Sequence, residues 1–171
     1  MSENDANEDI VSEETTQIAV ELLDELLVKM GVEASFESKP AETVMPSEET
    51  EDAIVFDIKG EDLGALIGRR GQTLACLQYL LRLMVANRVN SFAPIILDVN
   101  GYRQRRYLAL HSLASRIAEE VVANRMPSAL EPMPAFERRI IHITLAENSL
   151  VTTQSIGFGD NRKVVVLLKD E

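Results

Sequence analysis

The residues best suited to chemistry are two glycines that enclose two arginines, in the run Gly68-Arg69-Arg70-Gly71. Glycine has no side chain, so a turn with a glycine at each end lets another backbone approach closely. Arginine suits phosphate because its planar guanidinium can donate hydrogen bonds to two oxygens at once. A helix that starts directly after Gly71 would also direct its unpaired N–H groups at the same ligand. The run therefore predicts a turn that binds a sugar-phosphate backbone.

Apolar periodicity and turn residues predict the elements that must hold this turn in place. From residue 15 to 100, the expected order is a helix over 18–30, strands over 32–37 and 53–59, helices over 63–67 and 72–90, and a strand over 95–99. Asp62 can cap the first short helix. Cys76 is the only cysteine and, within an apolar helical pattern, is expected to be a buried small hydrophobe. The expected buried stripe of the long helix is Leu74, Leu77, Leu80, Leu81, Met84 and Val85.

A GxxG pattern alone is weak, because chance matches are frequent and an ordinary turn between helices is the simpler interpretation. Here Ile67 precedes the first glycine, Leu74 follows the second by three positions, and the turn falls between two expected helices. Together these features resemble the type II KH domain over about residues 15–100. The resemblance implies that Gly68, Arg69, Arg70 and Gly71 hold roughly four nucleotides of single-stranded RNA.

The second half of the chain predicts a smaller α+β unit over 101–171. The expected elements are a helix over 102–124, a proline-rich connector over 126–134, a helix over 135–147, and strands over 150–156 and 164–168. Arg138 and His142 lie four residues apart, so they share one face of the expected helix. Both can donate a hydrogen bond to one phosphate, the imidazole even when it is neutral. Without further context, such a pair is more often part of a solvated face.

The context of this pair adds a second resemblance. The run from Pro134 to His142, the strand ending Ser155-Ile156-Gly157, and the run Arg162-Lys163-Val164-Val165 resemble the R-x-x-x-H domain of nucleic-acid-binding proteins. A KH domain followed by this module resembles the Jag/KhpB (SpoIIIJ-associated) family of bacterial RNA-binding proteins. The resemblance implies Arg138 and His142 as RNA contacts, and a cytoplasmic post-transcriptional regulator or RNA chaperone linked to cell-envelope growth and division. It also implies a small KH-only protein as a possible heterodimer partner, and many members carry a further folded domain ahead of the KH domain.

Five more cations are possible RNA contacts. Arg103, Arg105 and Arg106 open the expected helix over 102–124, where a basic track and a solvated helix face are equally consistent with the pattern. Arg162 and Lys163 follow the turn between the last two strands and could touch phosphate.

The net charge of −11 argues against nucleic acid only at first sight. Residues 1–53 contain 16 acidic residues and 2 lysines, a balance of −14, whereas residues 54–171 contain 15 basic and 12 acidic residues, a balance of +3. The acidity thus belongs to the front of the chain, where residues 1–14 predict a disordered tail and about 38–52 a flexible loop. The remainder is mildly basic and compatible with RNA.

The sequence contains no GxxxxGK phosphate loop and no Cys/His cluster with zinc spacing. Neither an enzymatic activity nor a cofactor or metal is therefore expected. No apolar run approaches the roughly 18 residues of a transmembrane helix, so we expect no direct membrane insertion. The alternative function is a protein-interaction adaptor that uses the KH fold mainly for dimerisation.

Overall fold

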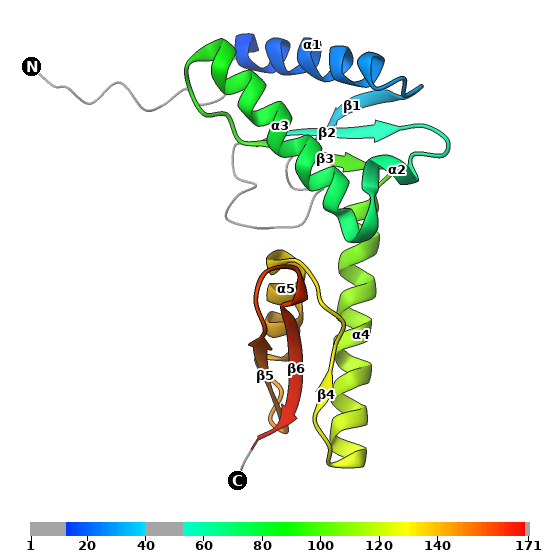
Figure 1. The fold of residues 1–171 in the computed structure, drawn as a ribbon, viewed down its shortest axis with the longest axis vertical. Helices are drawn as coiled ribbons and strands as arrows, with labels where there is room; N and C mark the ends of the chain where they lie inside the picture. Colours follow the sequence, from blue (N-terminus) through cyan, green and yellow to red (C-terminus); the bar gives the residue numbers. More distant parts are fainter. Residues whose placement is uncertain (1–12, 40–52, 170–171) are drawn as a thin grey trace, which may run out of the picture. The chain divides into compact units, whose positions relative to one another are not determined.

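The computed structural model describes residues 13–39 and 53–169, which form two compact units with a boundary between Arg103 and Gln104. Each unit combines helices with a three-stranded sheet, as Figure 1 shows. The predicted α+β class, with a KH-type unit before a smaller α+β unit, is confirmed. The tail expected over 1–14 and the loop expected over 38–52 lie outside the described residues, apart from 13–14 and 38–39, which belong to a helix and a strand.

The first unit has the predicted order of helix, strand, strand, helix, helix and strand. Its elements are α1 (Glu13–Lys29), β1 (Ser35–Lys39), β2 (Ile54–Lys59), α2 (Gly64–Ile67), the 3-10 turn η2 (Arg69–Gly71), α3 (Gln72–Val89) and β3 (Ile95–Val99). Strand β2 is central, antiparallel to β1 and parallel to β3. The helix α1 stops where the chain reaches Gly31, whose φ of +67° is a left-handed value that glycine adopts without strain.

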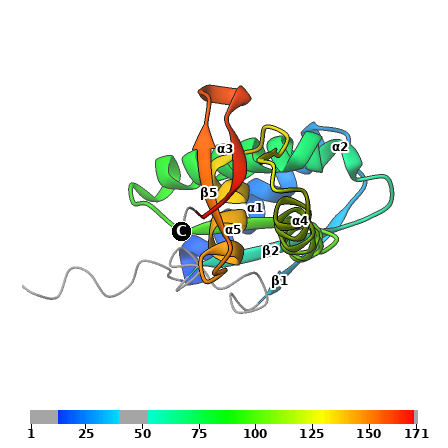
Figure 2. The ribbon, with the colours of Figure 1, turned by 90° about the horizontal axis from the view of Figure 1, so that it is seen from below.

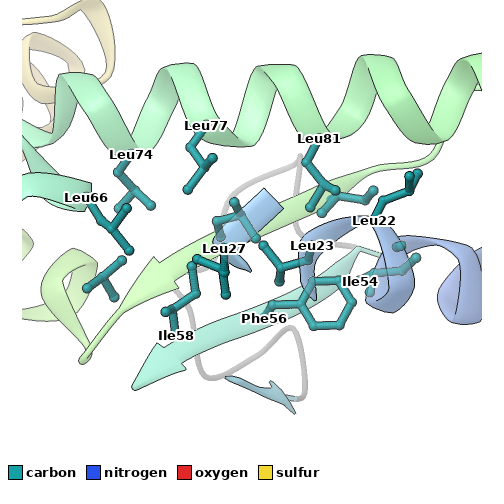
Figure 3. Close-up of a cluster of buried hydrophobic side chains, with 14 of the residues drawn as sticks. Leu22, Leu23, Leu27, Ile54, Phe56, Ile58, Leu66, Leu74, Leu77 and Leu81 are labelled. Atoms are coloured by element: carbon teal, nitrogen blue, oxygen red, sulfur yellow. The ribbon is translucent and has the colours of Figure 1, made fainter. Parts of the chain in front are cut away.

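The core of this unit lies between the sheet and the helices α1 and α3 (Figure 3). Side chains alternate across a strand, so every second residue of β2 points into this core. The labelled core residues in Figure 3 are Leu22, Leu23, Leu27, Ile54, Phe56, Ile58, Leu66, Leu74, Leu77 and Leu81. This packing positions α2 and α3, the two helices that flank the GxxG turn.

Three predictions about these helices are wrong. Cys76 and Leu80 are exposed, because α3 buries one stripe, at Leu74, Leu77, Leu81 and Val85, and both residues lie outside it. Asp62 does not cap α2: the N-cap residue is Leu63, and no described side chain makes a cap hydrogen bond there. Burial of Leu63 in the core holds the start of this short helix instead.

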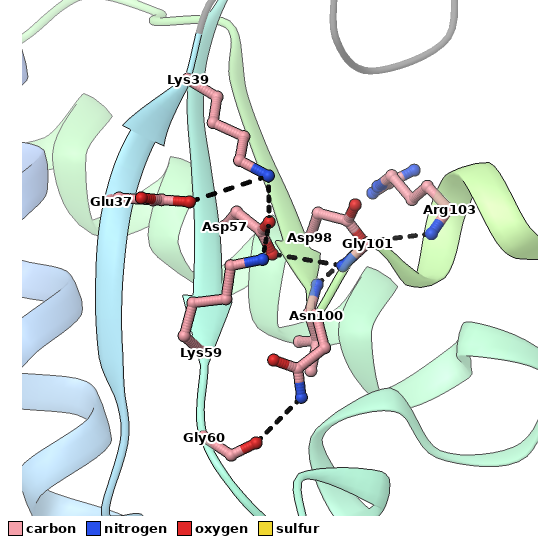
Figure 4. A network of polar contacts seen from close by, with 10 residues as sticks. Glu37, Lys39, Asp57, Lys59, Gly60, Asp98, Asn100, Gly101 and Arg103 are labelled. Carbon is pink, nitrogen blue, oxygen red and sulfur yellow. Dashed lines mark hydrogen bonds and ion pairs between the residues drawn. The ribbon is translucent and has the colours of Figure 1, made fainter.

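Two buried aspartates occupy matching positions in β2 and β3, where Asp57 pairs with Asp98 (Figure 4). Asp57 forms ion pairs with Lys39 of β1 and, at 2.6 Å, with Lys59. Asp98 accepts hydrogen bonds from the backbone N–H groups of Val99 and Arg103, at 2.8 and 3.1 Å. These contacts tie all three strands to the chain segment that follows β3.

The second unit contains most of α4 (Tyr102–Asn124), followed by β4 (Ser128–Ala129), α5 (Ala135–Leu145), β5 (Val151–Ile156), the 3-10 turn η3 (Gly159–Asn161) and β6 (Lys163–Leu168). The strands are antiparallel in the order β4-β6-β5. The segment 126–134 is not only a connector, as predicted, because Ser128 and Ala129 pair with β6. Its prolines hid this short strand, which lies at the sheet edge, where proline is tolerated nearby.

The helix α5 packs on the sheet of the second unit. Ile140, Ile141 and Leu145 are its buried apolar residues, and Val151 of β5 and Val164 of β6 are buried in the sheet. Because β5 alternates, Thr153 and Ser155 share the strand face of Val151. Within the described ranges, no helix is long and apolar enough to cross a membrane.

The buried Asp57 carboxylate gives a pH-dependent test of the first unit. Burial alone would raise the pKa of Asp57, but hydrogen bonds and charges from Lys39 and Lys59 outweigh it and lower the pKa below 3.8. Replacing Asp57→Asn removes these charge-assisted bonds, and we expect a loss of about 1–3 kcal/mol in the free energy of unfolding at pH 7. Because the folded pKa is the lower one, this advantage is present above about pH 4 and is lost as the pH falls through the folded pKa.

Urea denaturation across a pH series measures the difference, with Asp62→Asn as the matched control. Asp62 is exposed and has a φ of +51°, which asparagine also tolerates, so this variant should unfold like the wild type. A D57N deficit that stays constant down to pH 2 would contradict the ion-pair explanation.

Candidate nucleic-acid interface

The GxxG turn is a compact reversal between α2 and α3. The N–H of Gly68 donates to the Gly64 carbonyl at 2.9 Å, which closes α2, and the chain then turns at positive φ values of 68° at Gly68 and 75° at Gly71. The turn residue Arg70 also has a left-handed conformation, with φ of 54°. Three of the four residues thus occupy a region of backbone space that is costly for ordinary side chains.

Space, as well as φ, requires glycine at both ends of the turn. A Cβ at Gly68 would lie 2.0 Å from Thr73 Oγ1 and 2.9 Å from the Thr73 backbone nitrogen. A Cβ at Gly71 would meet the ring of Tyr102 at 3.0 Å. The backbone of the turn therefore packs directly against the first turn of α3 and against Tyr102, without side chains between them.

The start of α3 is suited to an anion. Gly71 is its N-cap residue, and no side chain in the described ranges forms a cap hydrogen bond there. The first N–H groups of a helix without a side-chain cap carry partial positive charge. The side chain of Arg69 is exposed beside them, whereas Arg70 is partly buried. The four predicted residues are thus brought together in one turn with positive potential.

In the second unit, Arg138 and His142 meet at one oxygen atom. Arg138 Nη1 donates to Ser155 Oγ at 3.1 Å, and His142 Nε2 lies 2.8 Å from the same oxygen. The other imidazole nitrogen, Nδ1, lies 2.6 Å from Thr153 Oγ1. Arg138 Nε also donates to the Met133 carbonyl at 3.3 Å. The spacing on α5 therefore places both side chains so that they can contact a single oxygen together.

His142 acts in this cluster as a neutral group. Burial, and to a smaller extent the positive charge of Arg138, lower the pKa of the imidazole from its ordinary 6.5. At pH 7 the pair therefore carries one positive charge, on Arg138, and one polar group that can donate or accept. An approaching phosphate would favour the protonated imidazole, since it adds negative charge near both side chains.

Two of the five additional cations make strong contacts inside their own units. Arg103 Nε donates to the Leu97 carbonyl at 2.8 Å, and its Nη2 donates to Gln78 Oε1 at 2.7 Å. Arg106 donates to both oxygens of the buried Glu137, at 2.7 and 2.8 Å. Neither the basic track nor the solvated face describes these two residues, because each links the start of α4 to another element of its own unit.

The other three cations lie at the surface or partly so. Arg105 and Arg162 are exposed, and Lys163 at the start of β6 is half-buried. Arg162 directly follows the turn η3, and its carbonyl accepts a hydrogen bond from the Met133 N–H at 3.1 Å. Arg138 bonds to the carbonyl of the same Met133. The end of the β5–β6 turn is thus connected through Met133 to the Arg138 site.

The sequence argument missed Thr153, Ser155 and Glu137. The two hydroxyl residues alternate along β5, a spacing that places them on one strand face, but the composition of a strand does not reveal which helix faces it. Glu137 and Arg106 are 31 positions apart, so their bond could not be found from local spacing. Among residues 13–39 and 53–169, no three His, Cys, Asp or Glu side chains cluster as metal ligands.

Comparison with known proteins agrees with this two-unit arrangement. Residues 20–96 match the KH domain of KhpA/KhpB, and residues 108–168 match the R-x-x-x-H domain family. The RNA-binding protein KhpB of Clostridium symbiosum is 39% identical over 155 residues, which is 90% of this chain and 66% of that protein. The chain belongs to the KhpB family.

Other members of the family show the same relation. The RNA-binding protein KhpB of Bacillus subtilis is 36% identical over 121 residues, 70% of this chain and 58% of that protein. That of Lactiplantibacillus plantarum is 42% identical over 106 residues, 62% of this chain and 33% of that protein. The chain thus spans between a third and just under two thirds of the length of these KhpB relatives.

The turn can be tested by adding one methyl group at each of two glycines. Gly68→Ala combines a left-handed φ with the contact to Thr73, and we expect it to reduce the free energy of unfolding by about 2–4 kcal/mol. Gly31→Ala is the matched control, because its φ of +67° is nearly the same but no described atom lies within 4 Å of the added Cβ. Its cost should be only about 1–2 kcal/mol. Equal costs in urea denaturation would show that the close approach at Thr73 is unimportant.

The ion pair in the second unit gives a second test. Arg106→Ala leaves the buried Glu137 carboxylate without its bidentate partner, and we expect a loss of about 3–5 kcal/mol in the free energy of unfolding. Arg116→Ala, at an exposed position of the same helix, should change stability by less than about 1 kcal/mol. Thermal unfolding followed by circular dichroism measures both. If the two variants are equally stable, Arg106 has no special structural role.

Proposed function

We propose that this chain binds single-stranded RNA through two contacts, the Gly68–Gly71 turn and the Arg138–His142 pair. The observation that carries the proposal is the geometry of the turn. Its backbone has no room for side chains at Gly68, it leads directly into an α3 start without a described side-chain cap, and it exposes Arg69. A sugar-phosphate backbone is the ligand that matches these three properties together.

The second contact supports the same ligand. Arg138 and His142 both reach Ser155 Oγ, and a phosphate offers oxygens of greater negative charge than a hydroxyl. The charge-assisted bond from Arg138 would be stronger to phosphate than to Ser155. Phosphate at this position would also favour a charged imidazole, so binding through this unit should tighten as the pH falls toward 6.

The KhpB relatives are named RNA-binding proteins, which supports the ligand class. On the family resemblance alone we extend the proposal to a role as a cytoplasmic post-transcriptional regulator or RNA chaperone in cell-envelope growth and division. A small KH-only protein as heterodimer partner belongs to the same extension. No catalytic role is included, because both matched domain families are nucleic-acid-binding modules rather than enzymes.

A second candidate function is a protein-interaction adaptor. The observation in its favour is an exposed apolar stripe on α3, formed by Tyr79, Leu80 and Leu83 at helical spacing. Such a stripe could pair the KH unit with another protein, whatever happens at the GxxG turn. The two functions are separable, since the stripe and the turn involve different residues.

A salt series with labelled single-stranded RNA tests the leading proposal. The wild type should bind with an affinity that falls as salt rises, because phosphate contacts release counterions. Arg69→Asp/Arg70→Asp should lose about 10–100-fold in affinity, since it reverses two charges at the turn. The charge-matched control, Arg116→Asp/Arg125→Asp, alters exposed arginines elsewhere and should retain most of the affinity.

Circular dichroism should first establish that each variant is folded. The Arg138→Ala/His142→Ala variant then reports the share of the second contact, and should weaken binding while the turn is intact. If the wild type does not bind, or binds no better than the turn variant, the RNA proposal is wrong. The α3 stripe would then be examined through Leu80→Ser/Leu83→Ser and a measurement of association state.

A further inference from the structure

We propose that Phe158, at the tip of the β5–β6 hairpin, stacks on an unpaired base of the RNA strand whose phosphate Arg138 and His142 contact. The inference rests on the proposed function and adds to it a base contact next to the second phosphate contact. It assigns Phe158 a role that neither the GxxG turn nor the Arg–His spacing suggests.

The first observation is the exposure of the ring. Phe158 is 90% exposed, more than any other large apolar side chain of the described residues. Burying a phenylalanine normally stabilises a protein by about 1.5–3 kcal/mol, and this ring contributes almost none of that. Its two neighbours, Gly157 and Gly159, have no side chains that could cover it. Both faces of the ring are therefore available to a planar ligand.

The second observation is that the tip is a defined turn. Gly157 has a φ of +86°, and a Cβ there would lie 2.9 Å from the Asn161 carbonyl oxygen. Asn161 N–H donates to the Phe158 carbonyl, and Arg162 N–H to the Gly159 carbonyl, both at 3.2 Å. In Figure 2 the tip projects away from α5 of the same unit. The fold thus holds an apolar ring in solvent on a turn fixed by hydrogen bonds, which limits the entropy lost on binding.

The third observation is the position of the tip relative to the phosphate contact. Ser155, whose hydroxyl oxygen is the point at which Arg138 and His142 meet, precedes Phe158 by only three residues. Three residues of extended chain span at most about 10–11 Å, which is comparable with the separation of neighbouring nucleotides in an extended strand. Met133 adds a second connection, since it bonds to both Arg138 and Arg162.

The chemistry around the ring selects an unpaired base. Arg162 and Lys163 follow the tip directly, so an exposed aromatic ring lies between cations and a phosphate contact. This combination is typical of single-strand binding, where bases stack on aromatic rings and the backbone lies along positive charge. Every base has a π-face, so the contact would add affinity without selecting a sequence. A duplex would not offer its bases in this way.

The absence of tryptophan from the sequence allows a direct experiment on the full chain. Phe158→Trp introduces a single fluorophore at the tip, and its emission should be quenched when oligouridine binds. The matched control is Leu150→Trp, at the exposed position just before the opposite end of β5, which should bind equally well with little quenching. Phe158→Ala should weaken oligouridine binding by roughly 5–100-fold, and Phe158→Leu by a similar factor, since leucine is apolar but cannot stack.

An abasic oligonucleotide of the same length separates stacking from other contacts. Wild type and Phe158→Ala should bind it with equal affinity, because it has no base to stack. If oligouridine binding depends on Arg138 and His142 but is unchanged in Phe158→Ala and leaves Phe158→Trp unquenched, the stacking proposal is overturned while the RNA proposal stands. If the wild type binds neither oligonucleotide, both are overturned.

Discussion

The close approach of Gly68 to Thr73 is the constraint on which the architecture of the first unit's turn depends. An added Cβ would meet the Thr73 side chain at 2.0 Å, so α2 and α3 can be joined in this way only when position 68 is glycine. The same contact is what brings the backbone of the turn next to the first N–H groups of α3. Tyr102 supports the turn from the start of α4 by packing at Gly71. A requirement of packing and a surface suited to phosphate therefore have one physical origin.

Buried acids hold the elements around each site. Asp57 and Asp98 connect the strands of the first unit to the segment that leads into α4 (Figure 4). Glu137 serves the second unit through its paired bonds to Arg106. Since Glu137 directly precedes Arg138, the ion pair also fixes the first turn of α5, from which Arg138 extends. The cations in these pairs are therefore committed to structure, and those at the proposed RNA contacts are different residues.

The sequence predicted elements and motifs better than it predicted the partners of individual side chains. Periodicity identified α3 correctly, yet it assigned Leu80 to the core, since an apolar residue beside a buried stripe looks the same whether it packs inward or faces solvent. The short strand β4 escaped detection because its two residues have no period and pair only after the rest of the sheet exists. Ser155 and Thr153 were missed for a related reason: hydroxyl residues are common in strands, and only the packing of α5 on β5 gives them a role. Spacing reports what lies on one face, whereas tertiary packing decides what that face meets.

Charge shows why local position matters more than the total. The chain has a net charge of −11, and its acidic excess lies in residues 1–53. At the Arg138 site, burial keeps His142 neutral, so the positive charge there is that of one arginine with a polar neighbour. Such a site holds a phosphate weakly by itself, and the same is true of a turn with one exposed arginine. Two weak contacts on one chain can nevertheless bind one RNA firmly, because the first contact makes the second intramolecular. Stacking by Phe158 would add affinity without adding charge, which suits a protein whose overall field repels nucleic acid.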